Sequence, residues 1–192
     1  MPPLILASGS RYRRELLVRL GFAFEVLVPD VDERVAPGEE VSAATLRLAR
    51  LKAAMIAARR PDALVLAGDQ LASVVGQPVG KPRDEAEARR QLQAMSGRTV
   101  TYSTAIALVV PGAAEPTTHL DTSHVTLRVF GADEIARYVE RERPFDCAGA
   151  LKLEGLGSAL CERIETSDPT ALIGLPLIAT ASLLREVGYP VP

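Results

Sequence analysis

The sequence predicts an α/β fold in which helices flank a mixed, twisted sheet, with a cleft between two lobes. In the first half of the chain, short apolar strand patterns alternate with helical ones. Two long β patterns, "RTVTYSTAIALVV" and "THLDTSHVTLRVF", flank the turn signal "PGAAEP", which favours an antiparallel pair. The length of 192 residues, with no repeat or long linker, indicates one domain over residues 1–192.

The first half is expected to alternate strands with helices. The expected elements are a strand over 2–7, a helix from 11 to 20, a strand over 24–28, a polar loop over 29–40, a helix over 42–60 and a buried strand over 63–67. Ser10 and Ser42 are suitable N-caps, and Gly21 and Pro61 follow the ends of the two helices. The buried strand is expected to end at Gly68-Asp69.

The second half begins with a small hairpin and ends with a helix. The expected elements are strands over 71–75 and 77–82, a helix over 84–96 closed by Ser96-Gly97, long strands over 98–110 and 118–130, a helix over 132–142, a strand near 159–165 and a helix over 176–187.

Composition excludes several classes of protein. The net charge of −2 provides no basic field for a nucleic acid polymer or an anionic membrane. No apolar run approaches the roughly 20 residues of a membrane span, and the N-terminus does not resemble a signal peptide. Cys147 and Cys161 form no disulfide framework and are expected to be reduced core thiols. We therefore expect a cytoplasmic protein.

Only three of the 22 basic residues are lysines, namely Lys52, Lys81 and Lys152. A compact ammonium and a guanidinium fork are not interchangeable at a phosphate, so lysines in an arginine-rich chain are candidates for such a site. Lys52 lies on or near the apolar face of its helix. The alternative to a phosphate-binding role is that it is a snorkelling lysine. Lys81 lies between a glycine and a proline, where an ordinary loop lysine is the alternative.

The junction between the first strand and the first helix has the features of an anion site. Ser8, Gly9 and Ser10 offer hydroxyls, backbone N–H groups and the positive end of a helix dipole. The spacing is not that of a Walker A loop. Arg13 shares a helical face with Leu17 and therefore points inward. An inward arginine needs an anion, which is either a phosphate or an internal carboxylate.

Two carboxylates follow strands near the same expected edge. Asp69 comes directly after a buried run, where a charge is costly unless it is paired or coordinated. Asp32 and Glu33 follow the second strand and could reach the same edge. Asp69 and Glu33 around one Mg²⁺ or Mn²⁺, ringed by Arg13 and the lysines, would suit polyphosphate chemistry. His119 and His124 have no zinc spacing and are expected on the surface.

Tyr12 and Glu154 are candidates for binding a base. A carboxylate can accept two parallel hydrogen bonds from the N1–H and amino edge of guanine. An aromatic face attracts a cationic ring such as N7-methylguanine. The alternative is that Tyr12 packs on the start of the helix and that Glu154 is a surface acid.

Taken together, the motifs resemble the Maf family of nucleotide pyrophosphatases over nearly the whole chain. They are "LILASGSRYRREL", "VDE", "LRLARLKA", "AGDQ", "GKP", "SG" after a helix, "CAGALKLEG" and "GLPL". The resemblance implies a fold similar to that of inosine triphosphate pyrophosphatases, with a nucleotide cleft. It implies metal-dependent hydrolysis of a nucleoside triphosphate between the α and β phosphates. A homodimer is expected by analogy.

The resemblance also assigns roles to individual residues. Asp69 would be the general base or a metal ligand, and Glu33 the second carboxylate of the metal site. The residues that would hold the triphosphate are Ser8, Ser10, Arg13, Lys52 and Lys81. The resemblance leaves Lys152 without a defined role.

Three positions, Tyr12, Gln70 and Glu154, correspond to those that separate a 7-methyl-GTP branch from a dTTP/UTP branch. The pyrimidine branch typically has Arg, Thr and Gln there, so this chain resembles the 7-methyl-GTP branch, which would remove modified nucleotides. Tyr12 departs from the tryptophan of that branch, which leaves its stacking strength open. The alternatives are a dTTP/UTP or broad-specificity pyrophosphatase and a non-catalytic nucleotide sensor in septum formation.

Overall fold

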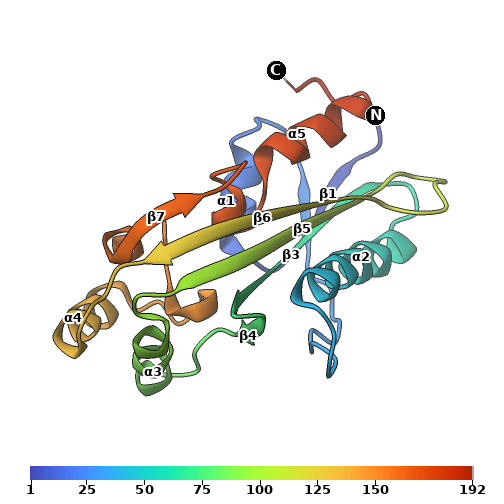
Figure 1. The fold of residues 1–192 in the computed structure, drawn as a ribbon. Helices are drawn as coiled ribbons and strands as arrows, with labels where there is room; N and C mark the ends of the chain where they lie inside the picture. Colours follow the sequence, from blue (N-terminus) through green and yellow to red (C-terminus); the bar gives the residue numbers. More distant parts are fainter. Residues whose placement is uncertain (192) are drawn as a thin grey trace. The chain divides into compact units, whose positions relative to one another are not determined.

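The computed structural model describes residues 1–191 and has the predicted mixed α/β architecture (Figure 1). Seven strands form one sheet in the order β2-β1-β3-β5-β6-β7, and β4 pairs with β3. The strands are β1 (Leu4–Ala7), β2 (Glu25–Leu27), β3 (Leu64–Val74), β4 (Gln77–Val79), β5 (Thr99–Val109), β6 (Thr117–Leu127) and β7 (Cys161–Glu165). The helices are α1 (Arg11–Val18), α2 (Val41–Arg59), α3 (Glu85–Met95), α4 (Ala132–Glu142) and α5 (Leu177–Glu186), with 3-10 turns η1 (Ala148–Ala150), η2 (Leu156–Leu160) and η3 (Ala171–Ile173).

The sheet combines parallel and antiparallel pairs. β1 runs parallel to both neighbours, so that Leu6 lies beside Val26 on one side and Leu66 on the other. β3 with β4 and β6 with β7 are antiparallel. β5 and β6 are also antiparallel, as predicted, because their facing residues run in opposite order. The facing pairs are Thr99 with Thr126 and Thr101 with His124.

The chain divides into two compact units. Unit 1 comprises Met1–Gln70, Thr104–Asp121 and the chain from Asp168 onward, and unit 2 comprises Leu71–Ser103 and Thr122–Ser167. In unit 2, α3 packs against α4 and against η1. Within the described chain, no helix combines the length and apolar character that crossing a membrane requires.

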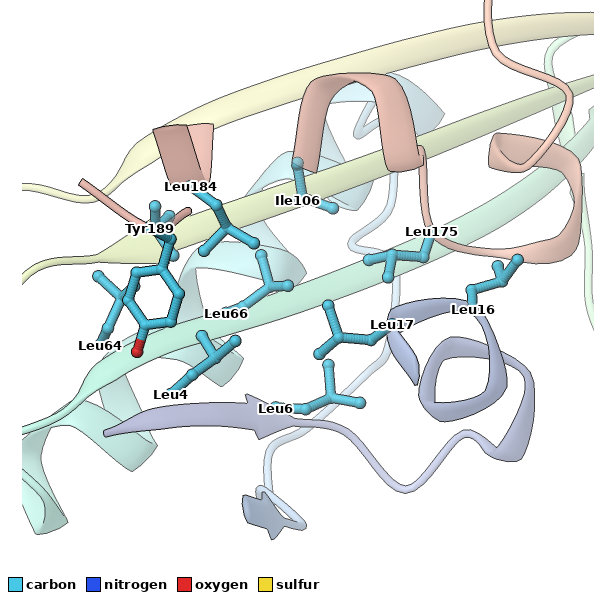
Figure 2. Close-up of a cluster of buried hydrophobic side chains, with 11 residues drawn as sticks. Leu4, Leu6, Leu16, Leu17, Leu64, Leu66, Ile106, Leu175, Leu184 and Tyr189 are labelled. Carbon is cyan, nitrogen blue, oxygen red and sulfur yellow. The ribbon is translucent and has the colours of Figure 1, made fainter. Parts of the chain in front are cut away.

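The core of unit 1 has two faces because successive strand residues point in opposite directions. In β1, Leu4 and Leu6 join a cluster with the leucines of α1 and α5, which Figure 2 shows in close-up. Ile5 and Ala7 join a second cluster that contains Ala49, Ala53 and Ile56 of α2. Helices therefore cover both faces of β1. Because this packing fixes the strand, it also fixes the position of the polar residues that follow its end.

Three expectations about local structure are wrong. β3 continues through Gly68-Asp69 to Val74, because its last residues pair with β4, so Asp69 lies inside a strand. α2 begins at Val41 with Glu40 as its N-cap residue, so Ser42 lies in the first turn and does not cap the helix. Cys147 and Cys161 are free thiols but are only half-buried. The exposed His119 and His124 agree with the prediction.

Candidate functional site

The loop between β1 and α1 is held by its own serines. The buried Ser8 hydroxyl accepts the Ser10 N–H at 3.1 Å. Ser10 caps α1, as predicted, and its hydroxyl accepts the Arg13 N–H at 3.4 Å. The first turn of α1 is thus fixed against the end of β1, where backbone N–H groups and the helix dipole favour an anion.

Arg13 points inward, as predicted, but its partners are neutral. Its Nε donates to the carbonyl oxygen of Gly174 at 2.8 Å, and its Nη1 donates to Ser8 Oγ at 3.3 Å. No carboxylate among residues 1–191 lies within 4.0 Å of its guanidinium nitrogens. Burial lowers the pKa of Arg13, although the charges of Asp69 and Glu33 oppose this shift. The internal salt bridge considered above is therefore not formed.

Lys52, Asp69 and Glu33 form an ion cluster in unit 1. Lys52 Nζ lies 2.6 Å from Asp69 Oδ1 and 2.8 Å from Glu33 Oε1. Lys52 and Asp69 are only 5% and 4% exposed, whereas 61% of the Glu33 side chain is accessible. Lys52 shares the buried face of α2 with Leu48 and Ala49 and is not a snorkelling lysine. Glu33 therefore places a carboxylate on the solvent-accessible side of this otherwise buried cluster.

Gln70 is fixed by the segment that precedes α5. Its Nε2 donates to Ala171 O at 2.8 Å, Leu172 O at 3.2 Å and Thr104 Oγ1 at 3.0 Å. Thr104 Oγ1 donates in turn to Ala171 O at 3.0 Å. Because these acceptors occupy the amide nitrogen, the amide oxygen is the group that Gln70 can offer to a ligand.

The buried Asp168 carboxylate organises this segment. Oδ1 accepts the N–H of Thr170 at 2.9 Å and its hydroxyl at 2.6 Å, and Oδ2 accepts the Ile178 N–H at 2.7 Å. Thr170 Oγ1 also accepts the Leu177 N–H at 2.8 Å. These bonds satisfy the first N–H groups of α5 and fix the loop whose Gly174 carbonyl holds Arg13.

Tyr12 is half-buried at the start of α1. The Arg11 guanidinium carbon lies 4.7 Å from the centre of its ring, and Arg11 Nη2 donates to the Tyr12 hydroxyl at 2.7 Å. The Tyr12 ring therefore contacts the cation of its neighbour in the same helix.

The other predicted site residues lie in unit 2. Lys81 is exposed just after β4. Glu154 is exposed in a turn, and desolvation by surrounding atoms raises the pKa of its carboxyl group. Lys152 forms an ion pair with Glu142 at 2.5 Å. The structure thus gives Lys152, which had no defined role, an internal partner.

The donors around Lys52 suit a hard divalent cation. Asp69 and Glu33 direct carboxylate oxygens toward the same Nζ atom. Mg²⁺ typically takes one or two protein carboxylates and completes its coordination with phosphate oxygens and water. In residues 1–191 no group of three or more His, Cys, Asp or Glu side chains could hold a metal. Asp69 and Glu33 are thus the two carboxylates of this cluster that could contribute to a cation site.

Comparison with known proteins assigns the family. A family model described as "Maf-like protein" matches residues 3–187. The chain belongs to the Maf-like protein family. It is 52% identical over 193 residues to a "7-methyl-GTP pyrophosphatase" of Xanthomonas axonopodis pv. citri, with full coverage of both chains. It is 50% identical over 189 residues to a protein of the same name from Ralstonia nicotianae, covering 98% of this chain and 97% of the relative. The predicted family is thus confirmed.

A solved structure, the Staphylococcus aureus Ham1 protein, matches this Maf-like protein with a TM-score of 0.46 and 17% identity, over 65% of this chain and 71% of that one.

Sequence reasoning missed several positioning groups of this Maf-like protein. Thr104, Asp168 and the carbonyl oxygen of Gly174 hold Gln70 and Arg13 in unit 1. Glu142 holds Lys152 in unit 2. The "GLPL" motif pointed to the right segment, but a backbone acceptor leaves no side-chain signal in a sequence.

Proposed function

We propose that this Maf-like protein hydrolyses a nucleoside triphosphate between its α and β phosphates, with 7-methyl-GTP as the preferred substrate. The observation that supports this reaction is the cluster in which the buried Lys52 contacts both the buried Asp69 and the accessible Glu33, in the unit that also holds Arg13. The names of relatives that are 50–52% identical over nearly the whole chain support the choice of nucleotide.

The positive groups of unit 1 would hold the phosphates. Ser8 and Ser10 line the start of α1, and Arg13 keeps its charge because arginine stays protonated. Its Nη2 is free of the bonds that fix Nε and Nη1, so the guanidinium can bind a phosphate oxygen without losing its position. Lys81 keeps the phosphate role that the family resemblance implies.

We assign the preparation of the attacking water to Asp69, the general base that the family resemblance implies. Asp69 would accept one proton, the oxygen would bond to the α phosphorus, and the bond from that phosphorus to the bridging oxygen would break. The products are a nucleoside monophosphate and diphosphate. Asp69 and Glu33 would hold a Mg²⁺ or Mn²⁺ ion, which supplies electrostatic stabilisation of phosphate charge. Lys52 keeps the two carboxylates together.

Base recognition would use one aromatic face and two polar groups. The Tyr12 ring would stack on the cationic methylated guanine. The Glu154 carboxylate would accept hydrogen bonds from its N1–H and amino groups, and Gln70 would offer its amide oxygen. A pyrimidine presents a different edge, so this set favours a guanine.

The test is diphosphate release by the purified protein with Mg²⁺ or Mn²⁺ from 7-methyl-GTP, GTP, UTP and dTTP. We expect the highest kcat/KM for 7-methyl-GTP and no release by Asp69→Asn. A higher value for UTP or dTTP would leave the phosphate site in place and refute the assignment of the base. Nucleotide binding without release would refute catalysis and favour the nucleotide sensor.

The metal requirement, a homodimer and a cytoplasmic location belong to the same proposal. A chelator should abolish diphosphate release, and added Mg²⁺ or Mn²⁺ should restore it. Light scattering after gel filtration should give twice the chain mass of 20.5 kDa.

A further inference from the structure

The turn that carries Glu154 is attached to α4 on both sides by one carboxylate. Glu142 Oε1 accepts from Lys152 Nζ at 2.5 Å, before Glu154 in the chain. Glu142 Oε2 accepts the Leu156 N–H at 2.7 Å, after it. All these residues lie in unit 2. Glu142 therefore fixes the two flanks of Glu154 at once.

Tyr138 adds a third attachment from the same face of α4, one helical turn earlier. Its buried hydroxyl donates to Ala150 O at 3.0 Å and accepts the Lys152 N–H at 2.9 Å. The backbone on the N-terminal side of the turn is thus held in addition to the Lys152 side chain.

The turn itself needs glycine. Lys152 O accepts the N–H groups of Gly155 at 3.2 Å and Gly157 at 3.0 Å. A Cβ atom on Gly155 would lie 2.5 Å from Glu142 Oε2. Only a residue without a side chain lets the carboxylate approach this closely, so the turn sequence and Glu142 are matched.

The Glu154 carboxylate has no partner from the other residues that the structure describes, although Lys152 lies only two positions away in the chain. No other described residue donates a hydrogen bond to its carboxylate or forms an ion pair with it. The charge of Lys152 acts on Glu154, because it opposes the rise in the pKa of Glu154 that desolvation causes. The hydrogen bond to Glu142 raises the pKa of Lys152, against the effect of desolvation, so Lys152 remains charged.

We propose that Glu142 is a specificity-determining positioning residue, which keeps Lys152 from pairing with Glu154 and so leaves the Glu154 carboxylate free for the base. Without the Glu142 charge, Glu154 would be the remaining carboxylate whose charge acts on the ammonium, and the ammonium would turn toward it. The ammonium would then neutralise the Glu154 charge and engage part of its acceptor capacity, which would weaken the two hydrogen bonds that the carboxylate offers to guanine. This inference rests on the proposed role of Glu154.

The test compares Glu142→Gln with Glu140→Gln, a matched control on the exposed side of the same helix. In Glu142→Gln we expect the KM for 7-methyl-GTP to rise about tenfold, the effect of losing one charge-assisted contact. The inhibition constant of tripolyphosphate, which has no base, should stay within about twofold. The Glu140→Gln variant should match the wild type in both measurements.

Two further variants isolate the lysine. In the double variant Glu142→Gln/Lys152→Gln no ammonium can reach Glu154, so the KM should fall back toward the wild-type value. The proposal would be overturned if the KM of the double variant were as high as that of Glu142→Gln alone. It would also be overturned if the inhibition constant of tripolyphosphate rose in Glu142→Gln as much as the KM does. If Glu142→Gln does not fold, Lys152→Gln alone removes the ammonium and should leave the KM for 7-methyl-GTP within about twofold of the wild-type value, because the proposal gives Lys152 no contact with the base. A rise of about tenfold in Lys152→Gln would overturn the proposal.

Glu154→Gln separates this inference from the proposed function. A raised KM for 7-methyl-GTP in Glu154→Gln with an unchanged KM in Glu142→Gln would overturn the positioning role alone. An unchanged KM in Glu154→Gln would overturn the contact between Glu154 and the base, and the inference with it.

Discussion

Unit 1 and unit 2 each contain a lysine, a carboxylate that pairs with it and a second carboxylate nearby, but the pairing differs. In unit 1, Lys52 contacts both Asp69 and Glu33. In unit 2, Lys152 contacts Glu142, and no other residue among 1–191 forms a hydrogen bond or an ion pair with the Glu154 carboxylate. Lys52 thus contacts both carboxylates of its cluster, whereas Lys152 contacts only Glu142 among the described carboxylates.

Burial explains the difference. An ionised carboxylate buried as deeply as Asp69, at 4% exposure, is costly unless a cation neutralises it. Glu154 is exposed to water and can stay unpaired. The buried Asp69 carboxylate thus depends on its paired lysine, whereas the exposed Glu154 carboxylate can accept hydrogen bonds from a ligand.

Asp69→Asn tests the paired carboxylate and should have the largest effect. Removing a general base lowers kcat by about 10²–10⁴-fold. Lys52 keeps its contact with Glu33 at 2.8 Å, so the buried ammonium is not stranded and the fold should survive. The measurement is kcat for diphosphate release together with the thermal midpoint.

Asp62→Asn is the matched control, because Asp62 is exposed and precedes the same strand. It should retain the wild-type kcat. If Asp69→Asn loses its cooperative unfolding together with its activity, Asp69 has a structural role and its catalytic assignment fails.

The two lysines provide a direct comparison of stability. Lys52→Met removes the cation of a buried cluster and should cost about 3–5 kcal/mol of unfolding free energy. Lys152→Met breaks a less buried pair and should cost about 1–2 kcal/mol. Urea unfolding of both variants measures the difference. Equal costs would mean that burial does not distinguish the two pairs.

Asp168→Asn weakens the segment that supports Arg13 and Gln70. The amide replaces one acceptor oxygen with a donor, so at least one of the N–H groups of Thr170 and Ile178 loses its partner, at a cost of about 1–3 kcal/mol. The KM for the nucleotide should rise, and the inhibition constant of tripolyphosphate should rise with it, because Arg13 is held through Gly174. A raised KM with an unchanged tripolyphosphate constant would contradict this connection.

The residues of unit 1 were easier to predict from sequence than those of unit 2. Lys52 lies on an apolar helical face and Asp69 follows a buried run, so burial itself marks them as needing partners. The helix over 132–142 was also predicted with its observed bounds. Glu142 was missed, because it ends that helix and meets Lys152 only after the chain turns at Arg143 and Gly149, which both have positive φ. Such a return of the chain is set by tertiary packing.

Glu154→Gln should have the smallest effect on stability, and in the favourable direction. Desolvation raises the pKa of Glu154 in the folded protein, so the unfolded chain loses this proton at a lower pH. Stability therefore falls as the pH rises from the unfolded to the folded pKa and stays reduced above it.

Glutamine cannot ionise, so Glu154→Gln should raise the thermal midpoint at pH 7 by at most about 2 °C, since solvent screens an exposed group. The difference should vanish near pH 3, where Glu154 is protonated in both states, because glutamate ordinarily titrates at about 4.3. Calorimetry at both pH values measures this. A lower midpoint for Glu154→Gln at pH 7 would mean that the carboxylate is stabilised by a protein partner, and the contrast between a paired Asp69 and an unpaired Glu154 would no longer hold.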